Sequence, residues 1–197
     1  MAEIIIENLR KAFGENTIFR DFSYSFEPQK IYALRGPSGV GKTTLLRLIA
    51  GLDTDYEGEI KGGGADRVSM VFQEYRLFSN LSAIDNVAKV SFTEADDDAY
   101  KLTRNMLRRL RFTDAEMQLY PSELSGGMKQ RVAIARAFLK KSAVILLDEA
   151  AKELDAELVS ILLELIREAS KTRTVIMITH DPDEAEILGA TVVEISR

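Results

Sequence analysis

Gly36-Pro37-Ser38-Gly39-Val40-Gly41-Lys42-Thr43 has the pattern G-x-x-x-x-G-K-[ST], which is typical of a loop that binds phosphate. Residues 30–35 (K-I-Y-A-L-R) predict a buried strand before it, and residues 43–50 (T-T-L-L-R-L-I-A) predict a helix that ends at Gly51. The alternative is a chance glycine turn before a core helix. The chemistry requires a strand, a glycine-rich turn and a helix start, so this context favours the phosphate-binding loop.

The loop offers several kinds of phosphate contact. Glycines let the backbone approach phosphate oxygens closely, and the free amides of the helix start point toward them. Lys42 adds a mobile positive charge for β- and γ-phosphates, and the Thr43 hydroxyl can hold Mg²⁺. The sequence therefore predicts a nucleoside triphosphate site with Mg²⁺.

Length and composition narrow the class of protein. The 197 residues suffice for one domain or for one domain with an inserted lobe, and 46% apolar residues support an ordinary buried core. The net charge of −5 argues against nucleic acid as a main partner, because phosphate backbones require a basic face. The absence of cysteine excludes disulfides and thiolate zinc sites.

The sequence predicts no segment that targets or crosses a membrane. The start M-A-E-I-I-I-E lacks the basic residues and the long apolar segment of a signal peptide. No apolar run approaches the roughly 18 residues that a membrane span requires. Any work at a membrane is therefore expected to involve docking on another protein.

Alternating strand and helix patterns predict an α/β fold built on a mainly parallel sheet. Phe22, Tyr24 and Phe26 alternate with serines and predict an antiparallel β region that feeds this parallel core. The triple glycine at 62–64 is expected to form a flexible hairpin turn, since no helix or lysine follows it. Strands are expected at residues 3–7, 22–26, 57–61, 68–72, 143–147, 174–179 and 191–195, and helices at 154–166 and 183–188.

Residues 80–139 predict a helical lobe inserted in this core, because strand patterns vanish there. The acidic run 94–98 is expected to be a solvated helix start; a metal site is the weaker alternative, because adjacent carboxylates on a helix face different directions. We expect one domain with its core at 1–79 and 140–197 and the lobe at 80–139. The lobe helices are expected over 97–110, with Tyr100, Leu102, Met106, Leu107 and Leu110 mostly at helical spacing, and over 126–140, with Val132, Ile134, Ala135 and Phe138 inward.

Two carboxylates, Asp148 and Glu149, follow the apolar run 143–147. Ligands of doubly wound sheets bind at the carboxyl ends of strands, so this end is expected beside the phosphate-binding loop. Asp148 can bind Mg²⁺, and Glu149 can orient and deprotonate an attacking water. A solvated loop pair is the alternative, but the strand and the loop motif favour function.

A second glycine-rich helix start lies at Leu124-Ser125-Gly126-Gly127-Met128. Free amides there form a second end that can bind an anion. One nucleotide has one γ-phosphate, so this end suggests a shared site that serves the nucleotide of a second protomer. Taken alone, a plain capped helix is the better interpretation.

Together these motifs resemble the ATP-binding subunit of an ABC transporter, over nearly the whole chain. Walker A is G-P-S-G-V-G-K-T, the signature is L-S-G-G-M-K-Q-R, and Walker B is I-L-L-D-E. Gln73 in V-F-Q-E matches the Q-loop, Leu154-Asp155 the end of the D-loop, and His180 in I-T-H-D the switch histidine. The resemblance implies a P-loop NTPase core and an Mg²⁺-dependent ATPase.

The resemblance also assigns roles to single residues. Phe13 is implied to stack on adenine, although alone it would be interpreted as core. His180, the only histidine, would alone be structural, but sharing a sheet edge with Asp148 and Glu149 favours a γ-phosphate contact. The Gln73 amide can reach Mg²⁺ or the attacking water.

The implied site falls into three sets. The catalytic set is Glu149, His180 and Gln73, and the metal set is Thr43, Gln73 and Asp148. The nucleotide set is Phe13, Gly36, Pro37, Ser38, Gly39, Val40, Gly41, Lys42, Thr43, Thr44, Ser125, Gly126 and Gly127.

The sequence departs from the family pattern in several places. Met128 replaces the usual glutamine, but activity is expected to survive because Ser125 and the Gly127 amide carry the chemistry. Ala150 replaces a common proline, and the D-loop reads K-E-L-D rather than S-A-L-D, changes that affect interface geometry. Since the sequence ends about one strand after His180, no C-terminal regulatory domain is expected.

The resemblance implies a working assembly. Two copies, or this chain and a paired ABC subunit, are expected to dimerise head to tail with ATP at the interface. A separate transmembrane permease subunit would be driven by this cycle at the cytoplasmic face of the membrane, with an external substrate-binding protein as a further partner. The region V-F-Q-E-Y-R-L-F resembles importer subunits for nitrate, sulfonate or taurine, and lipoprotein-release or division-type ATPases are alternatives.

Two rivals come from other classes. A soluble ABC ATPase acting on nucleic acid or ribosomes would carry coiled-coil insertions or two cassettes, and neither is found here. A nucleotide-binding regulator without turnover is disfavoured by the intact Glu149 and His180.

Overall fold

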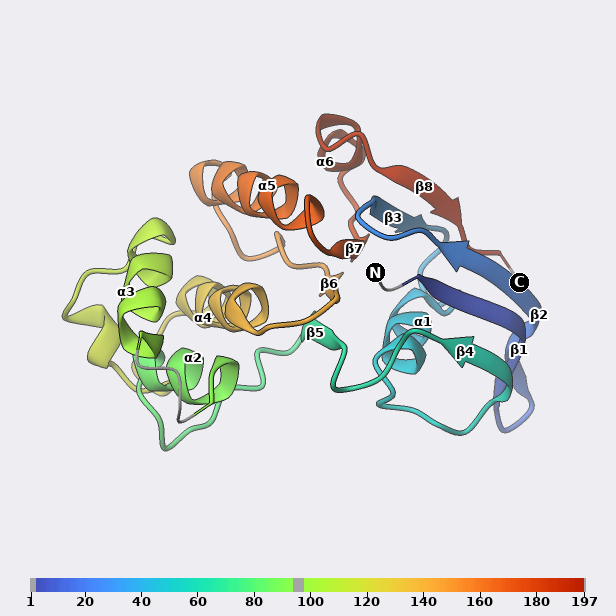
Figure 1. Ribbon diagram of the computed structural model, residues 1–197, viewed down its shortest axis with the longest axis horizontal. Coiled ribbons are helices and arrows are strands. Elements are labelled where there is room, and N and C mark those ends of the chain that lie inside the picture. Colours follow the sequence, from blue (N-terminus) through green and yellow to red (C-terminus); the bar gives the residue numbers. More distant parts are fainter. Residues whose placement is uncertain (1–2, 94–97, 197) are drawn as a thin grey trace. The chain divides into compact units, whose positions relative to one another are not determined.

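The computed structural model describes residues 3–93 and 98–196, which form two compact units (Figure 1). The first unit contains residues 1–70, 142–149 and 166–197, and the second contains residues 71–141 and 150–165. Helix α5 (Ala156–Ser170) has residues in both. The two sheets lie in the first unit, apart from the last residue of one strand.

A five-stranded sheet carries the strands that the sequence predicts as the core. Its order is β5-β6-β7-β3-β8, and β3 pairs in parallel with β7 and β8, as β6 does with β7. Every residue of β6 and β7 is buried, which confirms that these apolar runs are interior strands. The strands are β3 (Ile31–Arg35), β5 (Val68–Val71), β6 (Val144–Asp148), β7 (Thr174–Ile178) and β8 (Thr191–Glu194).

An antiparallel sheet of three strands, β1 (Ile4–Phe13), β2 (Asn16–Phe26) and β4 (Glu57–Lys61), confirms the predicted N-terminal β region. β1 continues well beyond the strand expected at residues 3–7. Its register shifts after Ile6 and again after Leu9, and Asn8 has a positive φ of 50°. These irregularities break the period-2 pattern on which strand prediction depends.

The prediction of a hairpin turn at 62–64 is wrong. β4 pairs with β1, whereas β5 neighbours β6, so the two strands belong to different sheets. The glycines carry the chain between those sheets. Gly62 and Gly64 have φ values of 81° and 106°, and a Cβ on Gly62 would collide with the carbonyl oxygen of Glu3. A close backbone approach, and not a tight turn, therefore requires the glycines here.

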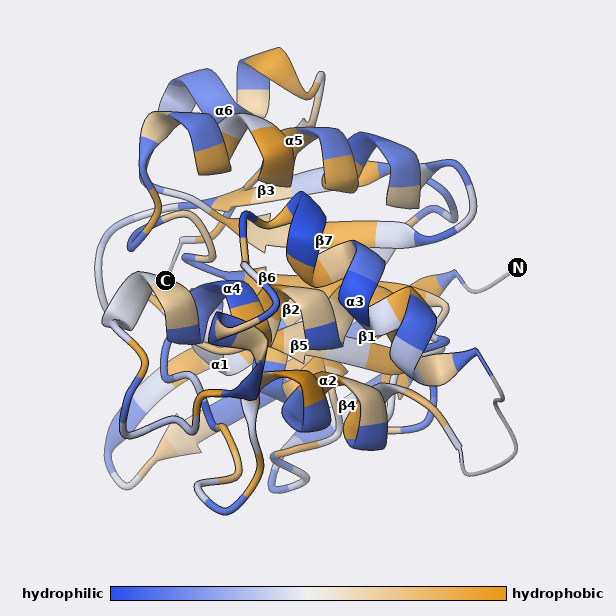
Figure 2. Cartoon of the chain, turned by 90° about the vertical axis from the view of Figure 1, so that its left-hand side faces the viewer, coloured by the Kyte–Doolittle hydropathy of each residue, from blue (hydrophilic) through white to orange (hydrophobic). Residues whose placement is uncertain are grey.

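Helix α1 (Lys42–Ile49) shares one apolar core with both sheets. Leu45, Leu46 and Ile49 of α1 are fully buried. They belong to the same cluster as Ile4 and Phe26 of the antiparallel sheet and as Leu146 and Ile176 of the parallel sheet. The central strands are coloured as hydrophobic in Figure 2, whereas α5 and the short α6 (Pro182–Ile187) alternate hydrophobic and hydrophilic residues. Burial of the three apolar side chains of α1 holds this helix against the two sheets.

The second unit is helical, as the sequence predicts. It contains α2 (Ala83–Ser91), α3 (Ala99–Arg109), the 3₁₀ turn η1 (Glu116–Gln118) and α4 (Gly126–Leu139). The predicted inward residues of α4, Val132, Ile134, Ala135 and Phe138, are all buried. Of the predicted acidic run, residues 94–97 lie outside the described residues. Asp98 precedes α3 and pairs with Lys101 at 3.7 Å.

Asn86 of α2 orders the loop that precedes that helix. Its side chain is fully buried, and Nδ2 donates to the carbonyl oxygens of Phe78 and Leu81 at 3.0 and 2.9 Å. Its Oδ1 accepts from the Phe78 amide at 2.8 Å. Because both ends of the amide are satisfied, this loop has a defined backbone despite the exposed Phe78 ring.

Tyr100 departs from the face expected for α3. Leu107 and Leu110 are buried, but Tyr100 and Leu102 remain 47% and 45% exposed. The Tyr100 hydroxyl donates to Asp85 Oδ1 of α2 at 2.6 Å. This hydrogen bond is the main cause that lowers the pKa of the Asp85 carboxyl, with Ser82 and Lys89 adding to it against partial burial. The ring therefore links α2 and α3 through a charged hydrogen bond at the surface.

Tyr100→Phe should make the protein's stability less dependent on pH. The lowered pKa means that Asp85 stabilises the fold above its unfolded pKa of roughly 4, and that this contribution is lost as pH falls through the folded value. We expect a loss of about 1 kcal/mol or less in the free energy of unfolding at pH 7, which shrinks toward pH 3. Urea unfolding at both pH values measures it. Tyr120→Phe, at an equally exposed ring, is the control, and equal effects of both variants would contradict the assignment.

Candidate functional site

The phosphate-binding loop of the first unit is shaped by its glycines. Gly36, Gly39 and Gly41 have φ values of 142°, 73° and 117°, which side chains rarely adopt. A Cβ on Gly36 would collide with the carbonyl oxygen of Ile195, and one on Gly41 with the Ile18 side chain. The loop backbone therefore requires glycine at positions 36 and 41 for both its φ values and its close contacts, whereas at position 39 only the φ value favours glycine.

Lys42 begins α1 and is held against the loop itself. Its Nζ donates to the carbonyl oxygens of Gly36 and Pro37 at 2.7 and 3.0 Å. The crest of the loop, Pro37 to Gly39, is exposed, and Val40 behind it is buried. Exposed backbone at the crest, a helix start and an ammonium group thus occur together, as phosphate binding requires.

Thr43 and Asp148, the two expected magnesium ligands of the first unit, lie together. Thr43 Oγ1 donates to Asp148 Oδ1 at 3.3 Å. Asp148 ends β6 and is only 2% exposed. Burial raises the pKa of its carboxyl and the charge of Glu149 adds to this, while the Thr43 hydrogen bond and the charges of Arg47 and Lys42 oppose it. A buried carboxylate with so few partners can accept a cation.

Glu149 and His180 are brought together at the same edge of the sheet. His180 Nε2 lies 2.8 Å from Glu149 Oε1. The Glu149 amide donates to the carbonyl oxygen of Ile178, the last residue of β7, at 3.1 Å. Glu149 has a φ of 51°, an uncommon value for a residue with a side chain. Such backbone strain occurs mostly where the surrounding structure holds a functional side chain in place.

Phe13, expected to stack on a base, ends β1 and is 53% exposed, so it is not a core residue. The ammonium of Lys11 lies over its ring, with Nζ 4.7 Å from the ring centroid. Lys11 itself is almost completely buried and is hydrogen-bonded to Asp53 and Asp55.

Neither Lys11 nor its two carboxylate partners was singled out from the sequence. A lysine two positions before an aromatic residue on a strand places both on one face, and this signal was available. The partners at 53 and 55 lie in a loop distant in the sequence, so only the fold pairs them with the strand.

The second glycine-rich helix start lies in the second unit. Ser125 caps α4, and its Oγ accepts a hydrogen bond from the Met128 amide at 3.2 Å. A Cβ on Gly126 would lie 3.0 Å from both Glu153 Oε2 and the Tyr75 hydroxyl, and one on Gly127 would lie 2.9 Å from the Glu153 carbonyl oxygen. The glycines thus admit segment 150–155 close to the start of α4.

The remaining predicted site residues also belong to the second unit. Gln73 lies two residues after β5 and is exposed. Asp155 precedes α5, and its Oδ1 accepts from the Leu158 amide at 2.9 Å. Nearby, buried Gln130 donates to the carbonyl oxygen of Ala150 at 2.8 Å and so ties α4 to the segment after Glu149.

The donors of the first unit fit a magnesium ion. Within the described residues no three His, Cys, Asp or Glu side chains gather as a metal cage. Mg²⁺ is commonly bound by one or two protein oxygens together with waters and substrate phosphates. The Thr43 hydroxyl and the buried Asp148 carboxylate, beside the phosphate-binding loop, are such a pair.

The fold and the residues at this edge of the sheet identify the class of the protein: it has a P-loop nucleotide-binding fold. A solved structure titled "Dimeric structure of a post-hydrolysis state of the ATP-binding cassette MJ0796 bound to ADP and Pi" matches with a TM-score of 0.87. It is 26% identical and covers 98% of this chain and 94% of its own.

Sequence comparison gives the family. The family model "ABC transporter" matches residues 19–152. The Fe(3+) ions import ATP-binding protein FbpC of Agrobacterium fabrum is 41% identical over 92% of this chain and 55% of its own length. The aliphatic sulfonates import ATP-binding protein SsuB of Bacillus subtilis is 40% identical over 94% of this chain and 77% of its own.

The chain therefore belongs to the ABC transporter family and carries its ATP-binding cassette. It spans little more than half the length of the FbpC relative. None of the helices in the described parts of the chain is long and apolar enough to cross a bilayer.

Gly36→Ala should cost more stability than Gly39→Ala. Both residues have positive φ, which costs a residue with a Cβ about 1–2 kcal/mol. Only at Gly36 would the new Cβ also collide with backbone, whereas Gly39 has open space around it. Thermal unfolding of the two variants measures the difference. Equal losses would mean that the loop does not need the close approach to Ile195.

Proposed function

We propose that this chain is the ATP-binding and ATP-hydrolysing subunit of an ABC importer. The observation that carries the proposal is the pairing of Glu149 with His180 at 2.8 Å, beside the pair of Thr43 and Asp148. A base, a positioning group and a magnesium site are what hydrolysis of a γ-phosphate needs at one place. The names of the relatives, which are import ATP-binding proteins, support the direction of transport.

The loop and helix start would bind and orient the phosphates. The backbone amides of residues 38–44 and the Lys42 ammonium would supply fixed positive charge, and Lys42 would exchange its bonds to Gly36 and Pro37 for phosphate oxygens. Phe13 offers an exposed ring for the base. All of these contacts would come from the first unit.

Glu149 would act as the base, and His180 would position it. A water held by the Glu149 carboxylate can lose its proton to that group as it attacks. The contact from His180 and the strained backbone of Glu149 restrict the carboxylate to one place. Thr43 and Asp148 of the first unit would hold Mg²⁺, which neutralises charge on the phosphates when bound.

The signature helix start would complete the site of a second copy. In the proposed head-to-tail dimer, Ser125, Gly126 and Gly127 of one copy contact the γ-phosphate bound by the other. Such fixed donors act by positioning and by electrostatic stabilisation. Support comes from the dimeric ATP-binding cassette that this fold matches.

The partners follow from this role. A separate permease subunit would couple the opening and closing of the dimer to transport at the cytoplasmic face of the membrane. An external substrate-binding protein would deliver the cargo. We further propose that core and lobe, divided at residues 80 and 139, act as one ATPase domain.

Glu149→Gln should retain ATP binding and lose turnover by about a hundredfold or more, since the amide cannot accept the proton. It should also accumulate a dimer in the presence of ATP. Phosphate release and gel filtration measure the two effects. Glu186→Gln, at an exposed glutamate of α6, is the control. Normal turnover in the Glu149 variant would remove this residue as the base.

Ser125→Arg should reduce turnover by about a hundredfold, because a fixed donor is lost and a bulky side chain enters the shared site. ATP binding to the loop of the same chain should change little. Ser25→Arg, at an exposed position of β2, is the matched control. Full turnover by the Ser125 variant, or by a strictly monomeric preparation, would contradict the shared site.

A further inference from the structure

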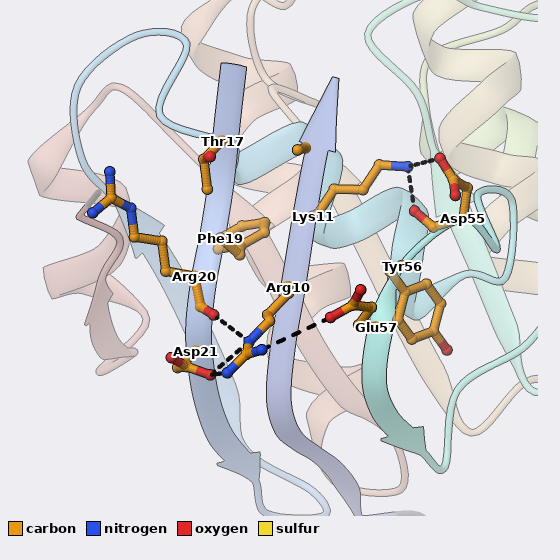
Figure 3. A pocket seen from close by; sticks show the side chains of 10 residues that line it. Arg10, Lys11, Thr17, Phe19, Arg20, Asp21, Asp55, Tyr56 and Glu57 are labelled. Atoms are coloured by element: carbon orange, nitrogen blue, oxygen red, sulfur yellow. Dashed lines mark hydrogen bonds and ion pairs between the residues drawn. The ribbon is translucent and has the colours of Figure 1, made fainter. Parts of the chain in front are cut away.

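Lys11 is the most completely buried cation on the described part of the antiparallel sheet, and it has no role in the site so far. Its side chain is 1% exposed, although Lys61 on the same sheet is 50% exposed. Nζ donates to Asp53 Oδ1 at 3.0 Å, to Asp55 Oδ2 at 3.3 Å and to the Asp55 carbonyl oxygen. Figure 3 shows the Lys11 side chain reaching across to Asp55. We call these three residues the Lys11 clamp.

The clamp keeps its charge. Burial lowers the pKa of the Lys11 ammonium, but the hydrogen bonds to Asp53 and Asp55 outweigh it, and the pKa is raised above its ordinary value. The two aspartates act unequally, because the Asp53 side chain is 23% exposed and that of Asp55 is 95% exposed. The link from Lys11 to Asp53 is therefore the part of the clamp that solvent screens least.

The Lys11 ammonium of the clamp lies against the ring of Phe13. Nζ lies 4.7 Å from the centroid of the Phe13 ring, a favourable distance for a cation over an aromatic face. The ring is 53% exposed, and its residue is the last of β1, next to a turn. Because one face meets the cation, the contact favours this orientation of the ring, while about half of the residue remains open to solvent.

This arrangement reduces the cost of binding a base. A free aromatic side chain at the end of a strand loses rotamer freedom when a base stacks on it, and that loss weakens binding. A ring already held by a buried cation has lost this freedom beforehand. The loop at 53–55, which holds Lys11, lies directly after Gly51 and the phosphate-loop helix α1, so the clamp also fixes the ring relative to the phosphate site.

We propose that the Lys11 clamp positions Phe13 to receive the nucleotide base, and that Lys11 is thereby a positioning residue for base binding. The inference rests on the proposed role of Phe13 in ATP binding. Since stacking uses the face of a base and not its edge, the clamp acts on adenine and guanine nucleotides alike.

The test compares the binding of three ligands to the intact chain: ATP, GTP and inorganic tripolyphosphate, which lacks the base. Lys11→Met keeps the length and apolar stem of the side chain but removes the charge. We expect ATP and GTP each to bind about fivefold to tenfold more weakly, and tripolyphosphate to bind within twofold of wild type. Lys61→Met on β4 is the control, and both affinities should stay unchanged.

A double-mutant cycle with Phe13→Leu tests whether Lys11 acts through the ring. In the Phe13→Leu background, Lys11→Met should have no further effect on ATP affinity. Asp53→Asn, which keeps a hydrogen-bond acceptor, is the milder variant if Lys11→Met does not fold. It should weaken ATP binding about twofold to threefold and leave tripolyphosphate binding unchanged.

The outcomes are distinct. Equal loss of ATP and tripolyphosphate binding, or unchanged ATP affinity in both clamp variants, would overturn the role of the clamp. Persistence of the Lys11→Met effect in the Phe13→Leu background would overturn it as well. If Phe13→Leu alone leaves ATP affinity unchanged, the proposed stacking role fails, and the inference about the clamp fails with it.

Discussion

The burial of the Asp148 carboxylate is the constraint on which the site depends. The residue is 2% exposed at the end of an interior strand, and its Oδ1 accepts a hydrogen bond from the Thr43 hydroxyl at 3.3 Å. A buried carboxylate costs free energy unless charge or hydrogen bonds compensate it. This cost is met where the start of α1 and the end of β6 come together, and the Mg²⁺ that we propose for this place would supply the missing charge.

The neighbouring groups follow from the same sheet edge. β6 and β7 pair in parallel, so Glu149 after one strand meets His180 after the other. The phosphate-binding loop follows β3, which pairs with the other side of β7. Strand order therefore places a loop for phosphate, a carboxylate pair and a histidine on adjacent strands, although the loop lies more than a hundred residues before the other two in sequence.

Most of the fold could be predicted from local patterns. The apolar runs 143–147 and 174–179 identified buried strands, and Phe22, Tyr24 and Phe26 identified a half-buried one, because regular strands have a simple period. The glycine-rich loop was recognisable since phosphate binding requires those residues at that spacing.

The parts that could not be predicted depend on distant contacts. The glycines at 62–64 were mistaken for a hairpin because sequence does not tell which sheet a strand joins. Tyr100 of α3 is not buried, and its hydroxyl donates a hydrogen bond to Asp85 of α2. Lys11 is buried only because the loop at 53–55 covers it with carboxylates. In each case the partner lies outside the window that a periodic pattern covers.

The left-handed backbone of Glu149 has a consequence for engineering this cassette. Glycine adopts a φ of 51° without strain, so a chain with glycine at this position would gain conformational ease while losing its carboxylate. If Glu149 is the base that we propose, backbone ease and turnover are thus opposed at a single residue. A library sorted only for survival at high temperature would then favour glycine here, so sorting must include turnover from the first round.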